Sequence, residues 1–221
     1  MNDATKLRIS LLGAPGSGKS TFATALAKEL RAQKGNPKST KSVKVVDKYV
    51  ERLRACIPED INAFDIHATY PQNLQIQFER WTKEQKAERS GAETLIVCGS
   101  IYETILYTAL RINSDLTLGA DKELQHYGRV MMECLGVTQT LTSVTDLLLF
   151  LPYDEKTLKA KGKSYDTVIN EKLPEVVAGY YRPLTVLQGT TKKKVIDAVN
   201  AVKAIEDWKS LQPTLDDEPT V

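Results

Sequence analysis

Short apolar runs alternate along this chain with longer amphipathic segments, and the alternation predicts strands and helices in turn. Five runs have the continuous apolar character of strands that are buried on both faces: residues 7–12, 43–46, 94–98, 146–151 and 184–187. The main segments with helical character are residues 21–30, 48–55, 71–89, 102–111, 121–135, 168–179 and 194–208. This order predicts a three-layer α/β/α sandwich with a five-stranded, mostly parallel sheet.

The segment 71–89 departs from the usual amphipathic pattern because its apolar stripe is thin. Ile76, Trp81 and Ala87 are the residues that we expect to face inward, while glutamines and charged residues fill the other positions. A helix as polar as this usually covers a surface or lines a cleft.

A chain of 221 residues has the length of one α/β domain. We therefore expect a single domain over residues 1–211, with a charged lid near residues 154–164. The stretch 212–221 is acidic and has no apolar pattern, so we expect a flexible tail there. Residues 113–118 read as a turn.

The strongest chemical signal follows the first predicted strand. The pattern G-x-x-x-x-G-K-[ST] of a phosphate-binding P-loop is met at every fixed position by Gly13, Ala14, Pro15, Gly16, Ser17, Gly18, Lys19 and Ser20. A strand, a glycine loop and a helix in this order aim backbone N–H groups and a helix N-terminus at a polyphosphate. We expect Lys19 to reach the β- and γ-phosphates, Ser20 to ligate Mg²⁺, and Thr21 to complete the nucleotide-binding set.

Composition adds few constraints. The formal net charge of +2 demands no nucleic-acid partner, so any DNA binding needs a local basic patch. Cys56, Cys98 and Cys134 lack metal-binding spacing, which favours free thiols in the cytoplasm over zinc or disulfides. With no apolar run near the roughly 20 residues of a membrane span and no secretory leader before the first strand, we expect a cytoplasmic protein without a membrane partner.

Asp47 stands directly after the second predicted strand. Open α/β sheets place ligands at the carboxyl ends of their strands, so Asp47 occupies a functional position if that strand lies beside the first or third one. The alternative is that Asp47 caps the helix predicted at 48–55. His67 lies in an irregular stretch and is more simply structural than catalytic.

Over roughly residues 7–205 the chain resembles the P-loop nucleoside and nucleotide kinases. It is most similar to the nicotinamide-riboside-kinase-like ATPases, a group with many bacteriophage members that include kinases of 5-hydroxymethyluracil in DNA. The loop at 13–20 carries the likeness, supported by the order of an acid, a glutamine-bearing helix, a short motif after the third strand, a charged lid and a final loop. The resemblance implies ATP and Mg²⁺ as cofactors and, for a phage protein, the host cytoplasm.

The chain departs from the family pattern after the third strand. Where such kinases usually carry an acid, this sequence has Cys98, Gly99 and Ser100. The resemblance then makes Asp47 the leading candidate for Mg²⁺ ligation or general base catalysis. Glu103, one turn into the next helix, is the second candidate.

The lid and the last loop also follow the family only loosely. Lids of these kinases usually carry arginines, whereas this one carries Lys156, Lys159, Lys161 and Lys163. Lysine can neutralise phosphoryl charge but lacks a bidentate fork, and a solvated charged loop is the alternative interpretation. In the loop after the fifth strand, Thr190 and Lys192 correspond to the residues that approach the adenine.

Gln75 and Gln77 lie where related kinases read an acceptor base with an amide, which offers both a donor and an acceptor. Two residues apart on a helix, they point in different directions, so at most one reads the base. Arg52, Arg54 and Arg129 are candidates for an acceptor phosphate, and the sequence does not choose among them.

The function that we predict is transfer of the γ-phosphoryl group of ATP to a nucleoside, a nucleotide or a modified base in DNA. The partners would be a nucleotide and a small-molecule or DNA acceptor, with a dimer compatible with the sequence. Two alternatives remain: an ATPase or GTPase switch, and a nucleotide-binding subunit without catalysis. The missing acid favours them, whereas the lack of an N/T-K-x-D guanine motif disfavours a GTPase.

Overall fold

The computed structural model describes residues 7–33, 43–47, 70–117, 122, 126, 128–130, 132–134, 145–162, 165–180 and 183–210. Several predicted features lie outside these residues: Arg52, Arg54, Cys56, His67, Lys163, the helix at 48–55 and the tail at 212–221.

The described strands form one parallel sheet in the order β2-β3-β1-β4-β5. They are β1 (Leu7–Leu12), β2 (Val43–Val46), β3 (Thr94–Cys98), β4 (Leu147–Phe150) and β5 (Thr185–Val186). Every neighbouring pair is parallel, so all carboxyl ends meet at one edge of the sheet. The predicted five-stranded α/β fold is confirmed. Strand β2 pairs with β3, which is one of the two neighbours that the functional interpretation of Asp47 allowed.

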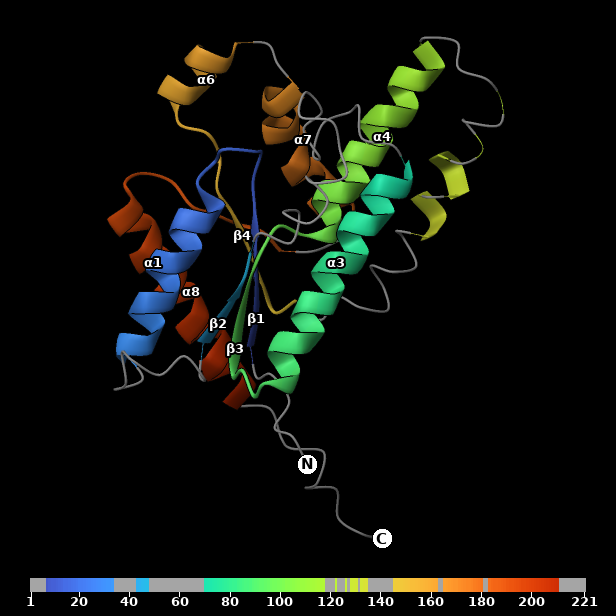
Figure 1. The fold of residues 1–221 in the computed structure, drawn as a ribbon. Coiled ribbons are helices and arrows are strands. Elements are labelled where there is room, and N and C mark those ends of the chain that lie inside the picture. The colour runs from blue at the N-terminus through green and yellow to red at the C-terminus, as the bar shows by residue number, and fades with distance from the viewer. Residues whose placement is uncertain are drawn as a thin grey trace, which may run out of the picture.

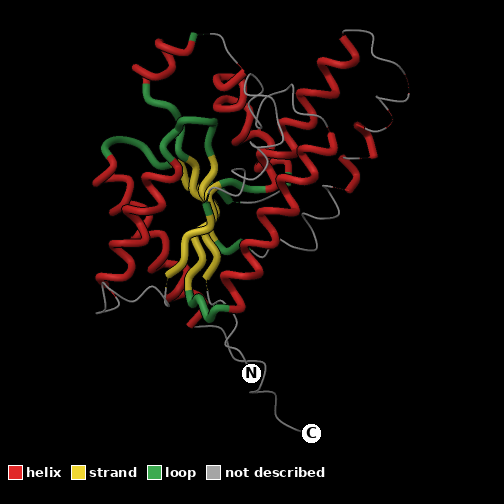
Figure 2. The backbone as a smooth tube through the Cα atoms, viewed as in Figure 1, coloured by secondary structure: helices red, strands yellow, loops and turns green. Residues whose placement is uncertain are grey.

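Helices cover both faces of the sheet (Figures 1 and 2). One face carries α1 (Lys19–Gln33) and α8 (Thr191–Ser210), which pack against each other. The other carries α3 (Tyr70–Arg89), α4 (Ile101–Thr117) and α7 (Tyr165–Gly179). The short helix α6 (Glu155–Lys161) lies beyond the carboxyl edge of the sheet, at the top of Figure 1.

Side chains of the central strand alternate between these two layers, as the period of a strand requires. Leu7, Ile9 and Leu11 join the core beneath α1 and α8. On the opposite face the polar Arg8 pairs with Glu84 and Glu88 of α3. The apolar core on that side is built instead mainly from α4 and α7.

Two local predictions need correction. Residues 113–117 belong to α4 rather than to a turn. Trp81 is 43% exposed, and among the α3 side chains that the structure describes the buried ones are the polar Gln77, Arg80 and Glu84. This polar face is accommodated because Arg8 reaches it from β1, an interaction between distant segments that periodicity does not reveal.

The segment predicted as a charged lid contains helix α6, which is not among the helices predicted from the sequence. Asp154 caps α6 by accepting a 2.7 Å hydrogen bond from the Thr157 amide. Hydrogen bonding to the Thr157 side chain, and next to its amide, lowers the pKa of the Asp154 carboxyl group. Gly162 ends the helix with a positive φ of 57°. Lys159 and Lys161 fall in the last turn, where cations are favoured by the helix dipole.

Candidate active site

The P-loop lies at the carboxyl edge of the sheet, between the central strand β1 and helix α1. A glycine is required at its first position. A Cβ on Gly13 would stand 2.5 Å from the Ser17 hydroxyl oxygen and 2.7 Å from the Leu151 carbonyl oxygen. Both distances are far below van der Waals contact, so the loop packs too closely for any side chain there.

Tyr153, which lies three residues after the end of β4, contacts the P-loop. Its hydroxyl donates to the Pro15 carbonyl, and its own amide donates to Asn170 Oδ1 at 2.7 Å. Burial raises the pKa of the Tyr153 hydroxyl, with the Asp166 carboxylate adding to the effect, so the hydroxyl stays a hydrogen-bond donor. No sequence pattern indicated this residue, because the contact joins segments 138 positions apart.

Lys19 is turned back onto its own loop. Its ammonium donates to the carbonyls of Gly13 and, at 3.2 Å, of Ala14. The same ammonium stands 3.6 Å from Oε1 of Glu103, which is the first acid of α4. The Lys19 and Glu103 side chains are only 17% and 6% exposed, so this is a largely buried ion pair.

Glu103 also holds the loop backbone. Its Oε1 accepts a buried 2.9 Å hydrogen bond from the Gly13 amide. Glu103, the second candidate for the missing acid, is thus in direct contact with the first residue of the P-loop.

Asp47 stands at the same edge, directly after β2, which pairs with β3 and is separated from β1 by that strand. The pairing of Val46 with Val97 brings Asp47 beside Cys98, whose thiol hydrogen-bonds to the Asp47 side chain. The pKa of the Cys98 thiol is raised, chiefly by burial and next by the Asp47 carboxylate, whereas Lys19 acts in the opposite direction. Cys98 is therefore a neutral thiol that is flanked by two carboxylates, Asp47 and Glu103, and by Lys19.

The two glutamines of α3 separate as predicted. Gln75 is exposed, whereas Gln77 is 6% exposed and donates from Nε2 to the Thr104 hydroxyl of α4. In the part of the chain that the structure describes, Gln77 Oε1 has no hydrogen-bond partner, and neither do the hydroxyls of Ser100 and Thr108. An unpaired buried polar atom is costly, and Gln77 contacts α4 through Thr104, which marks the α3–α4 seam as a candidate ligand contact.

The other candidates lie further out. Arg129 is exposed on a helical stretch of its own. Thr190 caps α8, since its carbonyl accepts from the Lys194 amide at 2.9 Å and its hydroxyl from the Lys193 amide at 3.3 Å. Lys192 lines a groove of about 610 Å³ between α1 and α8.

The lid lysines divide into two kinds. Lys156 and Lys159 are exposed, and Lys159 lies 3.8 Å from the exposed Glu155. Lys161 instead pairs with Asp166 and lies 5.4 Å from the centre of the Tyr153 ring. Through Tyr153 it is linked to the P-loop.

No group of three or more His, Cys, Asp or Glu side chains in the described ranges forms a metal cage. Mg²⁺ needs no such cage, because it takes one or two protein oxygens and completes its shell with phosphate oxygens and water. Ser20, exposed at the start of α1, and the carboxylate of Asp47 are the residues available for such an ion.

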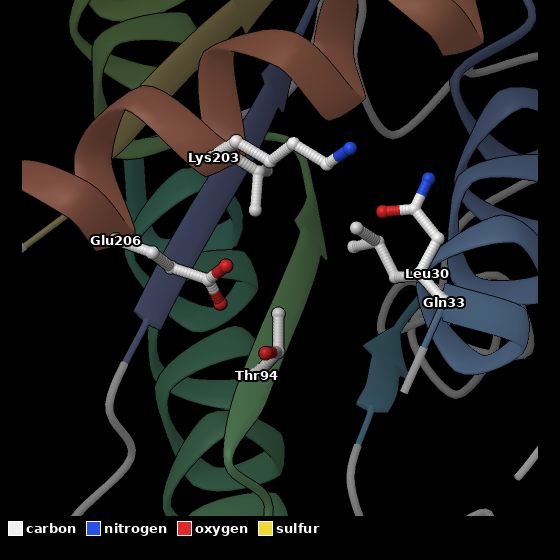
Figure 3. A pocket seen from close by; sticks show the side chains of 6 residues that line it. Leu30, Gln33, Thr94, Lys203 and Glu206 are labelled. Atoms are coloured by element: carbon white, nitrogen blue, oxygen red, sulfur yellow. The ribbon is translucent and has the colours of Figure 1, made fainter. Parts of the chain in front are cut away.

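A second cavity lies at the amino ends of the strands, away from the P-loop (Figure 3). It measures about 460 Å³ and is lined by Leu30, Gln33, Thr94, Val202, Lys203 and Glu206. Lys203 and Gln33 face each other across it, and Thr94 begins β3. No predicted site residue lines this cavity.

Comparison with known proteins defines the class of fold. No protein-family model and no curated protein matches the sequence. Among solved structures, NadR in complex with NR aligns over 95% of this chain at 12% identity with a TM-score of 0.61, and NadR with NAD and AMP-PNP at 13% and 0.63. The chain spans about half (51%) of the NadR chains.

Thymidylate kinase from Candida albicans aligns over 93% of this chain and 94% of its own length, at 17% identity with a TM-score of 0.60. The fold is therefore that of the P-loop kinases. Within the described residues, no helix is both long and apolar enough to cross a membrane.

Proposed function

We propose that this protein is an ATP-dependent kinase that transfers a γ-phosphoryl group to a nucleoside, a nucleotide or a modified base such as 5-hydroxymethyluracil in DNA. The observation that carries the proposal is the meeting of the P-loop, Lys19 and two carboxylates at one edge of the sheet. Acceptor activation needs a carboxylate close to the phosphate-binding lysine, and strand three does not supply one. The proposal is supported by the shared fold of NadR, which is solved with NR and with NAD and AMP-PNP, and of thymidylate kinase.

In this proposal different residues bind the phosphates, activate the acceptor and hold Mg²⁺. Loop amides and Lys19 hold the β- and γ-phosphates and neutralise the charge that spreads over the γ-phosphoryl oxygens. Asp47 orients the acceptor hydroxyl and takes its proton. A Mg²⁺ ion on Ser20 and Asp47, when bound, would add charge neutralisation between the phosphates.

The acceptor would lie against α3. Gln77 is the better candidate of the two glutamines because its amide oxygen is unpaired within the described part of the chain and faces the α3–α4 seam. An amide edge of a pyrimidine or a nicotinamide has the donor that such an oxygen lacks. Lys156 and Lys159 on α6 would close over the phosphates and exclude water.

The direct test is turnover with a panel of nucleosides, mononucleotides and duplexes that contain 5-hydroxymethyluracil. ADP formation that requires an acceptor supports the kinase. ADP formation at the same rate without one indicates the second candidate, an ATPase switch, which the cysteine at the end of β3 favours. ATP binding without any turnover indicates a nucleotide-binding subunit.

The role of Asp47 is tested by Asp47→Asn. If Asp47 is the base, turnover falls by about 10² or more, while ATP affinity changes little. If Asp47 only caps the helix that the sequence predicts at 48–55, asparagine is an equally good cap, and both stability and turnover remain near wild type. The isosteric substitution therefore separates the two interpretations, with the thermal midpoint measured alongside the rate.

A further inference from the structure

The contacts of Glu103 differ from those that its local sequence predicts. Ser100-Ile101-Tyr102-Glu103 has the S-x-x-E pattern of a capping box, in which the serine hydroxyl and the glutamate would satisfy the first amides of α4. A purely structural role for Glu103 would be this cap. In the described residues, however, the Ser100 hydroxyl has no hydrogen-bond partner, and Glu103 Oε1 binds the Gly13 amide on the P-loop instead.

The same oxygen also faces Lys19. Glu103 Oε1 lies 2.9 Å from the Gly13 amide nitrogen and 3.6 Å from Lys19 Nζ. The ammonium of Lys19 is held from its other side by the carbonyls of Gly13 and Ala14. One carboxylate, 4% exposed as a residue, thus holds both the backbone and the cation of the phosphate-binding loop.

A phosphate and this carboxylate compete for Lys19. Both are anions, and Lys19 carries a single charge on a flexible stem that can swing between them. A buried carboxylate beside an incoming polyphosphate also repels it, and low exposure weakens solvent screening of that repulsion.

We propose that Glu103 is a positioning residue that holds the resting P-loop closed through Lys19, and that nucleotide binding exchanges the Lys19–Glu103 pair for a Lys19–phosphate contact while Gly13 stays bound. The inference rests on the proposed nucleotide-binding function. In this proposal Glu103 lowers the affinity for the nucleotide, and acceptor activation remains the role of Asp47.

Two variants of Glu103 separate the contacts. Glu103→Gln keeps an oxygen for the Gly13 amide but removes the charge that competes for Lys19. Glu103→Ala removes both. Glu29→Gln makes the same charge change on the exposed side of α1, about 15 Å along the helix from Lys19, and serves as the control.

The measurement is titration calorimetry with ADP in the presence of a chelator and without any acceptor. We expect Glu103→Gln to bind ADP about tenfold tighter than wild type, which corresponds to about 1.4 kcal/mol. Glu29→Gln should bind as wild type does. If Glu103 were only a helix cap, Glu103→Gln would leave ADP binding unchanged, because glutamine serves equally well at this position of a capping box.

Amide hydrogen exchange of ligand-free protein supplies the second readout. The Gly13 amide should remain protected in Glu103→Gln and lose protection in Glu103→Ala. Equal or weaker ADP binding by Glu103→Gln, or unchanged Gly13 exchange in Glu103→Ala, would overturn the role of Glu103 alone. Absence of ADP binding by the wild-type protein would overturn the proposed function itself.

Discussion

Removal of Lys19 should test the electrostatics of the loop as well as the chemistry. In Lys19→Ala the Glu103 carboxylate would remain in a site where its side chain is 6% exposed, without the cation 3.6 Å away. Two unit charges at that distance attract by about 4–5 kcal/mol at an effective dielectric constant of about 20, before desolvation is subtracted. We therefore expect Lys19→Ala to lower the free energy of unfolding by about 2–4 kcal/mol.

A double-mutant cycle isolates this pair. Glu103→Gln removes the stranded charge, so the double variant Lys19→Ala, Glu103→Gln should recover part of the loss, with a coupling energy of about 1–3 kcal/mol. Urea unfolding of the four proteins, followed by circular dichroism without nucleotide, gives the values. A coupling below about 0.5 kcal/mol would refute the buried pair. The folded double variant should still lack phosphoryl transfer, because the cation that stabilises the transferring group is gone.

Three further outcomes follow from the same geometry. Chelation of Mg²⁺ should abolish turnover while leaving measurable ATP binding, since loop amides bind phosphate without metal; equal loss of both would contradict this. Residues 154–162 should exchange amide hydrogens rapidly in free protein and slowly with nucleotide plus acceptor, whereas strong protection in free protein would reject the lid. Gly13→Ala should cost about 2–3 kcal/mol, against about 1 kcal/mol for Gly16→Ala, because only Gly13 lacks room for a Cβ; equal unfolding free energies would contradict the close packing.

The fold was predictable because its signals are local. Each strand is a short apolar run, and the glycine loop fixes where the first strand ends and α1 begins. Three strands have the predicted bounds, and β4 and β5 are shorter by residues at their ends. Helix α6 escaped prediction because its stability comes from the Asp154 cap and the Gly162 stop rather than from an apolar stripe.

The site was only partly predictable because its contacts join distant segments. The sequence identified Asp47 and Glu103 as the available acids, but not that Glu103 binds Gly13, ninety positions away. Tyr153 gave no signal at all, since a tyrosine after a buried strand is common in a core. The sequence did indicate that the usual acid is missing, because β3 ends in Cys98, so acids on neighbouring elements had to be considered.

The polar face of α3 connects these observations to the acceptor. Gln77, Arg80 and Glu84 recur at helical spacing, and all three are buried on a helix that packs against α4, β2 and β3. Glu84 and Arg80 are paired by charge, at 3.1 Å, whereas the Gln77 oxygen is left without a partner in the described part of the chain. Unlike these charged pairs, the buried Gln77 oxygen would gain a hydrogen bond when a ligand supplies the missing donor. An acceptor base that donates to Gln77 would therefore both bind and fix α3 beside the residues that hold the phosphates.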